Sequence, residues 1–140
     1  MAADGHRRYR LDVADSQANA DAFGRPGSGR GEGVGGYPQA HVVALVECGT
    51  HAVIDAALGG WHDAEVRLAE GLDRSLTPGM LVLGDRDFAS TRLVRAWTAT
   101  GADVCLRVKA NRRLPVDRML PDGSWPTTTR RTGWGRWWSG

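Results

Sequence analysis

The segment Met80-Leu-Val-Leu-Gly-Asp-Arg-Asp-Phe88, in which a short apolar run is followed by charged residues, gives the clearest indication of the fold. A continuous apolar run of this length is typical of a strand that is covered on both faces. Ser90 follows as a good N-cap, and apolar residues keep helical spacing from there to Gly101. The stretch therefore predicts a strand, a charged turn and a helix.

The residues before this stretch predict a hairpin and a helix. Residues 41–48 and 51–58 are rich in β-branched and apolar side chains, and the Gly-Thr pair between them indicates a turn. Asp63 is a plausible N-cap for a helix that runs to about Leu76, because apolar residues recur there every four positions.

Residues 103–109 predict a last strand, which we expect in the same sheet as the hairpin and the strand at residues 80–84. The resulting order is β-β-α-β-α-β. Helices between strands imply crossover connections, so this order predicts an α/β fold with a small mixed sheet.

Length and composition limit the class of protein. The 140 residues leave room for one ordinary domain, and a formal net charge of +2 does not by itself indicate a nucleic-acid partner. No apolar run approaches the ~20 residues of a membrane helix, and the first residues do not read as a signal peptide. Two cysteines make no disulfide framework, which favours a reducing compartment.

The chain divides into three zones. Residues 1–36 form a polar arm that ends in a glycine-rich loop, residues 37–115 form the α/β domain, and residues 116–140 form a polar, tryptophan-rich tail that we expect to be irregular.

Two apparent motifs lack the context that their chemistry needs. Gly31-x-Gly33-x-x-Gly36 formally matches a dinucleotide-binding fingerprint, but it precedes a predicted strand, so a flexible loop is the favoured interpretation. Cys48-x-x-His51 is a lone pair without a second pair at zinc-site spacing. We therefore expect structural roles for the histidines and buried, apolar roles for both cysteines.

Asp85 is the most informative single residue, because open α/β sheets build their sites at the carboxyl ends of strands. A buried carboxylate there needs a metal ion, an arginine or a helix N-terminus nearby. The structural alternative is that Asp85 or Asp87 merely caps the helix that follows.

Four basic residues gather at the end of the last predicted strand. Arg107 and Lys109 would point to one face of a strand, with Arg112 and Arg113 just beyond. Such a cluster is able to meet a phosphate backbone, whereas the structural alternative is a solvated charged rim.

Several segments in register resemble a known family, over roughly residues 11 to 125. They are Leu11-Asp-Val-Ala-Asp15, Phe23-Gly-Arg-Pro-Gly-Ser-Gly-Arg30, Val43-Ala-Leu-Val-Glu-Cys-Gly-Thr-His51, Pro78-Gly-Met-Leu-Val-Leu-Gly-Asp-Arg-Asp-Phe88, Arg107-Val-Lys-Ala-Asn111 and Leu120-Pro-Asp-Gly-Ser124. Together they resemble the catalytic domain of DDE insertion-sequence transposases of bacteria.

The resemblance implies an RNase H-like fold and an Asp-Asp-Glu set that holds Mg²⁺ or Mn²⁺. Two such ions about 3.5–4 Å apart would act at a phosphodiester. Asp85 matches the second carboxylate of the family, and Asp12 is a further candidate metal ligand. The implied partners are DNA at insertion-sequence ends and another transposase subunit, and the implied location is the cytoplasm, in association with the bacterial nucleoid.

The chain also departs from the family pattern. Arg7 stands where the first carboxylate is expected, and the similar Asp4-Gly5 lies about three residues early. No glutamate follows Lys109, so the third ligand is absent. The chain is thus expected to be a copy that is incomplete at both ends, inactive in cleavage, and left with uncovered sheet surface. The alternative is a non-catalytic DNA-binding or regulatory fragment that acts with an intact transposase.

Overall fold

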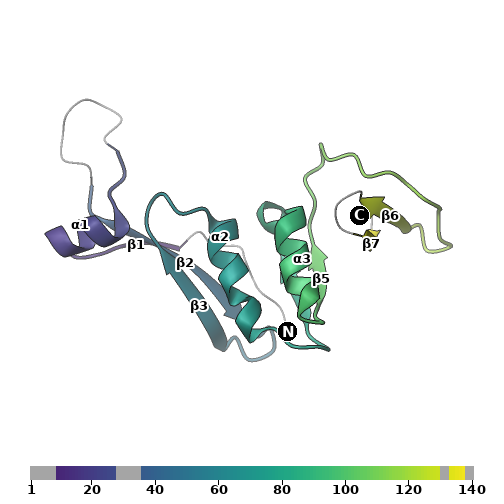
Figure 1. The fold of residues 1–140 in the computed structure, drawn as a ribbon, viewed down its shortest axis with the longest axis horizontal. Coiled ribbons are helices and arrows are strands. Elements are labelled where there is room, and N and C mark those ends of the chain that lie inside the picture. The colour runs from purple at the N-terminus through teal and green to yellow at the C-terminus, as the bar shows by residue number, and fades with distance from the viewer. Residues whose placement is uncertain (1–8, 28–35, 130–132, 138–140) are drawn as a thin grey trace.

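The computed structural model describes residues 9–27, 36–129 and 133–137 (Figure 1). The elements, in chain order, are β1 (Tyr9–Asp12), α1 (Gln17–Phe23), β2 (Gln39–Val46), β3 (Val53–Gly59), α2 (Glu65–Glu70), η1 (Gly71–Ser75), β4 (Leu81–Gly84), η2 (Arg86–Phe88), α3 (Thr91–Ala99), β5 (Asp103–Leu106), β6 (Trp125–Thr129) and β7 (Gly133–Trp137), where η marks a 3-10 helix.

The predicted hairpin is confirmed as β2 and β3, which pair antiparallel with Val42 opposite Leu58. The carboxylate of Glu47 closes the connecting loop, because it accepts hydrogen bonds from the amides of Gly49 (3.1 Å) and Thr50 (2.6 Å). A further hydrogen bond from the Thr50 hydroxyl, and then these two amide bonds, lower the pKa of Glu47. β1 extends this sheet on the other side of β2.

The predicted strand–helix–strand unit is also confirmed. β4 and β5 pair in parallel, and α3 connects them. The hydroxyl of Ser90 accepts a hydrogen bond from the amide of Leu93 at 3.2 Å, so Ser90 is the N-cap of α3 as predicted. Gly101 follows the helix with a φ of 86°, a conformation that glycine adopts without steric cost.

The single mixed sheet that we expected is not what the structure shows. β1, β2 and β3 form one sheet, and β4 and β5 form a second one, with no ladder between them among the described residues. Helices join the two sheets instead: the indole of Trp97 on α3 donates to the carbonyl of Ala69 on α2 at 3.2 Å. Apolar periodicity predicts which segments are strands, but it does not fix which strands become neighbours.

One core lies between the helices and one face of the sheets. Its largest buried side chains come from β2, η1, β4, η2 and α3. They are Leu45, Leu72, Val82, Phe88, Leu93 and Trp97. β4 uses only one of its faces for this core, since Leu81 is 46% exposed and Leu83 is 39% exposed. The expectation of a strand covered on both faces is therefore wrong for this structure.

Asp63 is not the cap of the helix that follows it. The N-cap of α2 is Ala64, and the Asp63 carboxylate accepts a hydrogen bond from the amide of Gly60 at 2.7 Å. The Asp63 carboxylate, which we expected to cap the helix, therefore stabilises the turn after β3 instead. The predicted helix over residues 63–76 is divided into α2 and η1.

Both terminal zones contain elements that the sequence analysis missed. Within residues 1–36 lie β1 and α1, and the Ser16 hydroxyl caps α1 by accepting from the amide of Asn19. The tail 116–140, expected to be irregular, contains an antiparallel hairpin of β6 and β7. Its Trp- and Thr-rich residues favour strands, a signal that the polar composition of the tail hid. Gly31 and Gly33 lie outside the described residues.

None of the helices in the described part of the chain is long and apolar enough to cross a membrane.

Candidate functional site

Asp85 lies directly after β4, as predicted, and is half-buried, with its Oδ1 atom withdrawn from solvent. Its backbone carbonyl accepts a hydrogen bond from the amide of Phe88 at 3.0 Å and so begins η2, but its side chain makes no capping bond to that helix. Ser90 caps α3 instead. The alternative that the Asp85 carboxylate caps the following helix is therefore not supported by the geometry.

The other aspartates that we considered as ligands are engaged elsewhere. Asp12, on the exposed strand β1, accepts a hydrogen bond from the side chain of Gln39 at 2.7 Å and belongs to the other sheet. Asp15 pairs with Arg25, and Asp87 pairs with Lys109. Arg7, at the expected position of a first carboxylate, lies outside the described residues.

The described residues contain no group of three or more His, Cys, Asp or Glu side chains that could hold a metal ion. Two catalytic ions need carboxylates that converge from several elements. Asp85 and Asp12 come from different sheets and are not part of such a group. This part of the chain therefore does not fit the two-metal site that the resemblance implies, and we derive no reaction step through metal.

The cysteines and histidines in the described part of the chain add no site. Cys48 and Cys105 are both exposed, so the expectation that they are buried is wrong. His41 is buried beside Trp61, and its Nδ1 atom lies 3.2 Å from the carbonyl of Asp63, which is a structural environment. His6 is outside the described residues.

The predicted basic cluster follows β5 rather than continuing it. The strand ends at Leu106, so the prediction that Arg107 and Lys109 share a strand face is wrong. The amide of Arg107 still donates to the carbonyl of Gly84 at 3.1 Å, which holds the start of the basic segment beside the end of β4. Arg113 is exposed farther along the same segment.

Two cations of this segment reach back to the turn after Asp85. Lys109 Nζ lies 3.3 Å from Oδ1 of Asp87. The guanidinium of Arg112 donates to the carbonyl of Ala89 at 2.5 Å and lies 3.5 Å from the hydroxyl of Thr91. Arg112 therefore ties the basic segment to the start of α3.

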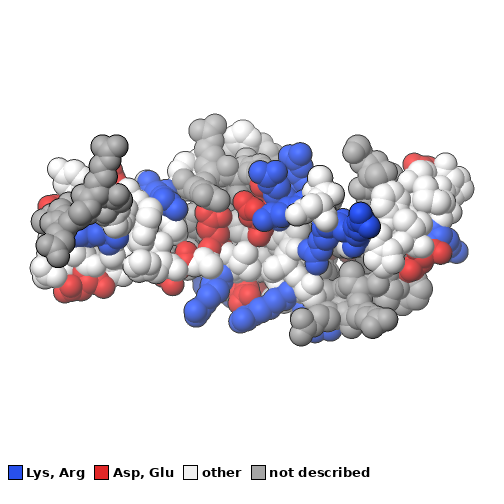
Figure 2. All heavy atoms as spheres, turned by 90° about the horizontal axis from the view of Figure 1, so that it is seen from above, with Lys and Arg blue, Asp and Glu red and all other residues white. Residues whose placement is uncertain are grey.

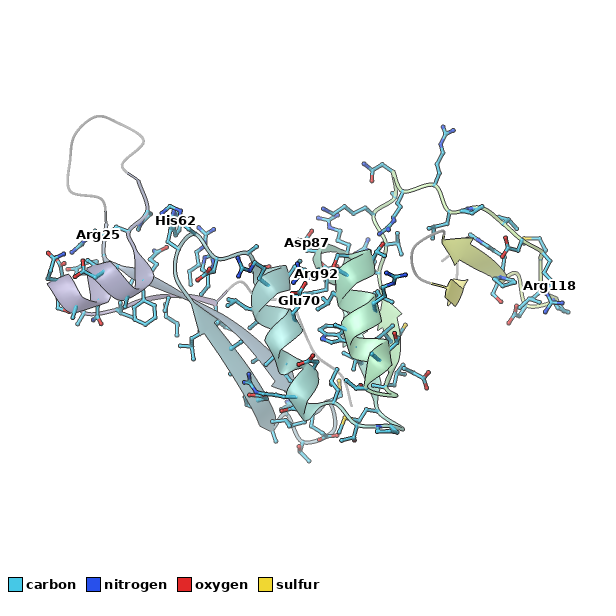
Figure 3. The ribbon with its side chains drawn as sticks, in the orientation of Figure 1. Arg25, His62, Glu70, Asp87, Arg92 and Arg118 are labelled. Atoms are coloured by element: carbon cyan, nitrogen blue, oxygen red, sulfur yellow. The ribbon has the colours of Figure 1, made fainter. Side chains whose placement is uncertain are left out.

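The residues that make these contacts line a pocket of about 440 Å³ at the start of α3, which is open to solvent. It is lined by Arg86, Asp87, Ala89, Ser90, Lys109, Asn111 and Arg112. Figure 3 shows Asp87 near the end of α3 at which Arg92 meets Glu70 of α2, with 2.8 Å between Arg92 Nε and Glu70 Oε1. Figure 2 looks down on this end of the molecule, where Lys and Arg side chains gather beside acidic ones.

Sequence reasoning missed Arg86 as a member of this site. The sequence did hold a signal for Arg86, since this residue stands between Asp85 and Asp87 directly after the predicted strand. What the sequence did not show is that the segment after β5 folds back onto that turn. The three cations that line the pocket can bind and orient an anionic substrate.

The fold and this site define an α/β domain in which a strand-end carboxylate stands next to a basic segment. The family model for the transposase DDE domain matches residues 5–136, and the chain belongs to that family. The resemblance drawn from the sequence motifs is thereby confirmed, and the family implies a role in transposition with DNA as substrate. No curated protein and no solved structure matched the chain.

Proposed function

We propose that the chain acts in DNA transposition as a DDE domain that contacts phosphates at insertion-sequence ends and does not cut DNA by itself. Arg107, Lys109, Arg112 and Arg113 are the proposed phosphate contacts. The proposal includes the RNase H-like strand order that the resemblance implies, to which the antiparallel sheet β1–β3 and the parallel pair β4–β5 would both contribute.

The observation that carries the DNA contact is the anchoring of the basic segment. The bond from Arg107 to Gly84 and the bonds from Arg112 to the start of α3 hold exposed cations beside Asp85. Cations on a fixed segment lose less conformational entropy on binding than cations on a free tail. A solvated rim would not need such anchoring.

The lack of cleavage is proposed from the ligand set. Asp85 is the one carboxylate at the expected place, and we propose that it binds Mg²⁺ or Mn²⁺ weakly. Asp12, the other ligand that the resemblance implies, is bonded to Gln39 on the other sheet, and the described residues hold no group of three or more possible ligands. Catalysis tolerates little displacement of its groups, about 1 Å for a hundredfold loss of rate.

The incomplete set of metal ligands also favours a second candidate function, in which the chain is a non-catalytic partner of an intact transposase subunit. Such a fragment would occupy DNA ends without cutting them. The two candidates differ in their effect on an intact transposase of the same element. A regulatory fragment lowers the strand cleavage of that transposase when both are mixed, whereas an independent domain leaves it unchanged.

The DNA contact is tested with a fluorescent duplex of an insertion-sequence end and the purified chain at several salt concentrations. Replacing Arg107, Lys109 and Arg113 together by alanine should weaken binding and lower the slope of log K against log salt by up to about 3, because each phosphate contact contributes about 0.9. Arg112 stays, since it anchors the segment. The matched control removes three exposed arginines elsewhere: Arg67, Arg95 and Arg118. Equal slopes in both triple variants would contradict the proposal.

The same preparation tests cleavage on supercoiled plasmid with Mg²⁺ or Mn²⁺. We expect no nicking by the wild-type chain. Its control is Asp103, an exposed aspartate at the amino end of β5 and hence at the far end of the same sheet. Metal-dependent nicking that is lost in Asp85→Asn and kept in Asp103→Asn would show a complete site and overturn this part of the proposal.

A further inference from the structure

The pocket at the start of α3 has the charge of an anion site. Arg86 comes from η2, whereas Lys109 and Arg112 come from the segment after β5. Among the described residues, a single carboxylate, that of Asp87, lines the pocket with them. Three cations that converge from two segments on one cavity form a local site, which differs from a row of cations along a chain.

Arg112 is already oriented in this pocket. Its Nη1 donates to the Ala89 carbonyl and its Nη2 lies near the Thr91 hydroxyl. A guanidinium carries five N–H donors, so these contacts fix the group and still leave donors for a ligand. A fork that is held in place before binding matches the paired oxygens of a phosphate.

The start of α3 adds a favourable field. The first turn of α3 contains no acidic residue, and Arg92 in that turn pairs with Glu70 of α2. The positive end of the helix dipole is therefore not compensated from within α3, and the pocket opens beside it at Ser90.

Asp87 stands where it would compete with an anion. Its ion pair with Lys109 is exposed on both sides, and exposed pairs of this kind are weak. A phosphate that binds in the pocket can therefore replace Asp87 as the partner of Lys109 with little loss of interaction energy. Without a bound phosphate, the ion pair with Asp87 keeps Lys109 beside the pocket.

We infer that this pocket seats one phosphate group of a DNA strand, held by Arg86, Lys109 and Arg112, and that Asp87 is an internal competitor which the phosphate displaces. The inference rests on the proposed function. It adds a residue outside the basic segment, Arg86, and it places binding in one cavity rather than evenly along residues 107–113.

Fluorescence anisotropy with the labelled duplex distinguishes binding in one pocket from even binding along residues 107–113. The variants that test this each remove one positive charge. Arg86→Ala and Lys109→Ala should each weaken binding about tenfold, as expected for the loss of a charge-assisted hydrogen bond, and Arg113→Ala, outside the pocket, should weaken it less than about threefold. Asp87→Asn should tighten binding, while Asp103→Asn should leave it unchanged. Circular dichroism confirms that each variant is folded.

Inorganic phosphate distinguishes the pocket from general attraction of anions. At equal ionic strength, phosphate should displace the duplex from the wild-type chain more strongly than chloride does, and this excess should vanish in Arg86→Ala. If the wild-type chain does not bind the duplex, the proposed function fails. If it binds, but Arg86→Ala and Arg113→Ala weaken binding equally or Asp87→Asn weakens it, only the phosphate pocket is overturned.

Discussion

The two faces of the sheets differ in what covers them. On the face that meets the helices, Leu45 is 1% exposed and Val82 is 0% exposed, and Leu93 of α3, in the same core, is also 0% exposed. On the opposite face, Leu58 is 62% exposed, and Leu81 and Leu83 of β4 are also open to solvent. Both faces carry aliphatic side chains, but only the first is part of the core.

An apolar run in the sequence shows which residues can be buried, not which ones are buried. In β4, side chains alternate between the faces, so Val82 enters the core and its two leucine neighbours do not. Stability should therefore depend on the two faces very unequally.

The largest effect is expected on the covered face. Leu93→Ala should lower the free energy of unfolding by about 3 kcal/mol, because it removes a fully buried side chain and leaves a cavity. Urea unfolding followed by circular dichroism measures this loss. Leu93→Met keeps the volume and should cost less than about 1.5 kcal/mol. Equal losses in the two variants would contradict the tight packing of α3 against the sheets.

A smaller, pH-dependent effect is expected from the polar contact on the same face. Asp55 of β3 lies opposite Leu45 and accepts hydrogen bonds from Arg74 Nη2 (2.7 Å) and from the Ser75 hydroxyl (2.6 Å), which hold η1 on the sheet. The bond from Arg74 first, and then that from Ser75, lowers the pKa of Asp55. The charged form is therefore favoured in the folded state.

The sign of the pH dependence follows from that shift. The stabilisation by Asp55 should be complete above the unfolded-state pKa of about 3.9, and it should be lost as the pH falls through the lower pKa of the folded state. Urea midpoints of wild type and Asp55→Asn should differ most near pH 7 and converge below about pH 4. Asp103→Asn is the control for a general change of charge, and a difference independent of pH would contradict the assignment.

The sequence predicted those features that depend on neighbouring residues. The N-cap at Ser90, the glycine at position 101 and the β2–β3 hairpin are local, and all three are confirmed. The separation of the two sheets was not predictable, because strand pairing joins residues far apart in the chain. The hairpin β6–β7 was missed because polar composition was taken as irregular structure.

In the candidate site, too, the local features were predicted from the sequence and the long-range ones were not. Asp85 was placed correctly at the end of a strand, since a strand and the turn after it are local. The pocket was not foreseen, because it needs Lys109 and Arg112 to fold back over more than twenty residues onto η2 and α3. Charge patterning identified the basic segment, whereas only the tertiary structure adds Arg86 to it.

The smallest effect is expected on the open face, where Leu58→Thr is the most direct test. Threonine is β-branched and favours strands, and the Leu58 side chain points away from the core that its neighbour Ala57 contacts. The free energy of unfolding should therefore change by no more than about 0.5 kcal/mol in the urea experiment used for Leu93. Leu83→Thr on β4 should behave alike, because Leu83 also lies on an open face. A loss comparable to that of Leu93→Ala, at either position, would show that this face is covered in solution and would remove the contrast between the two faces.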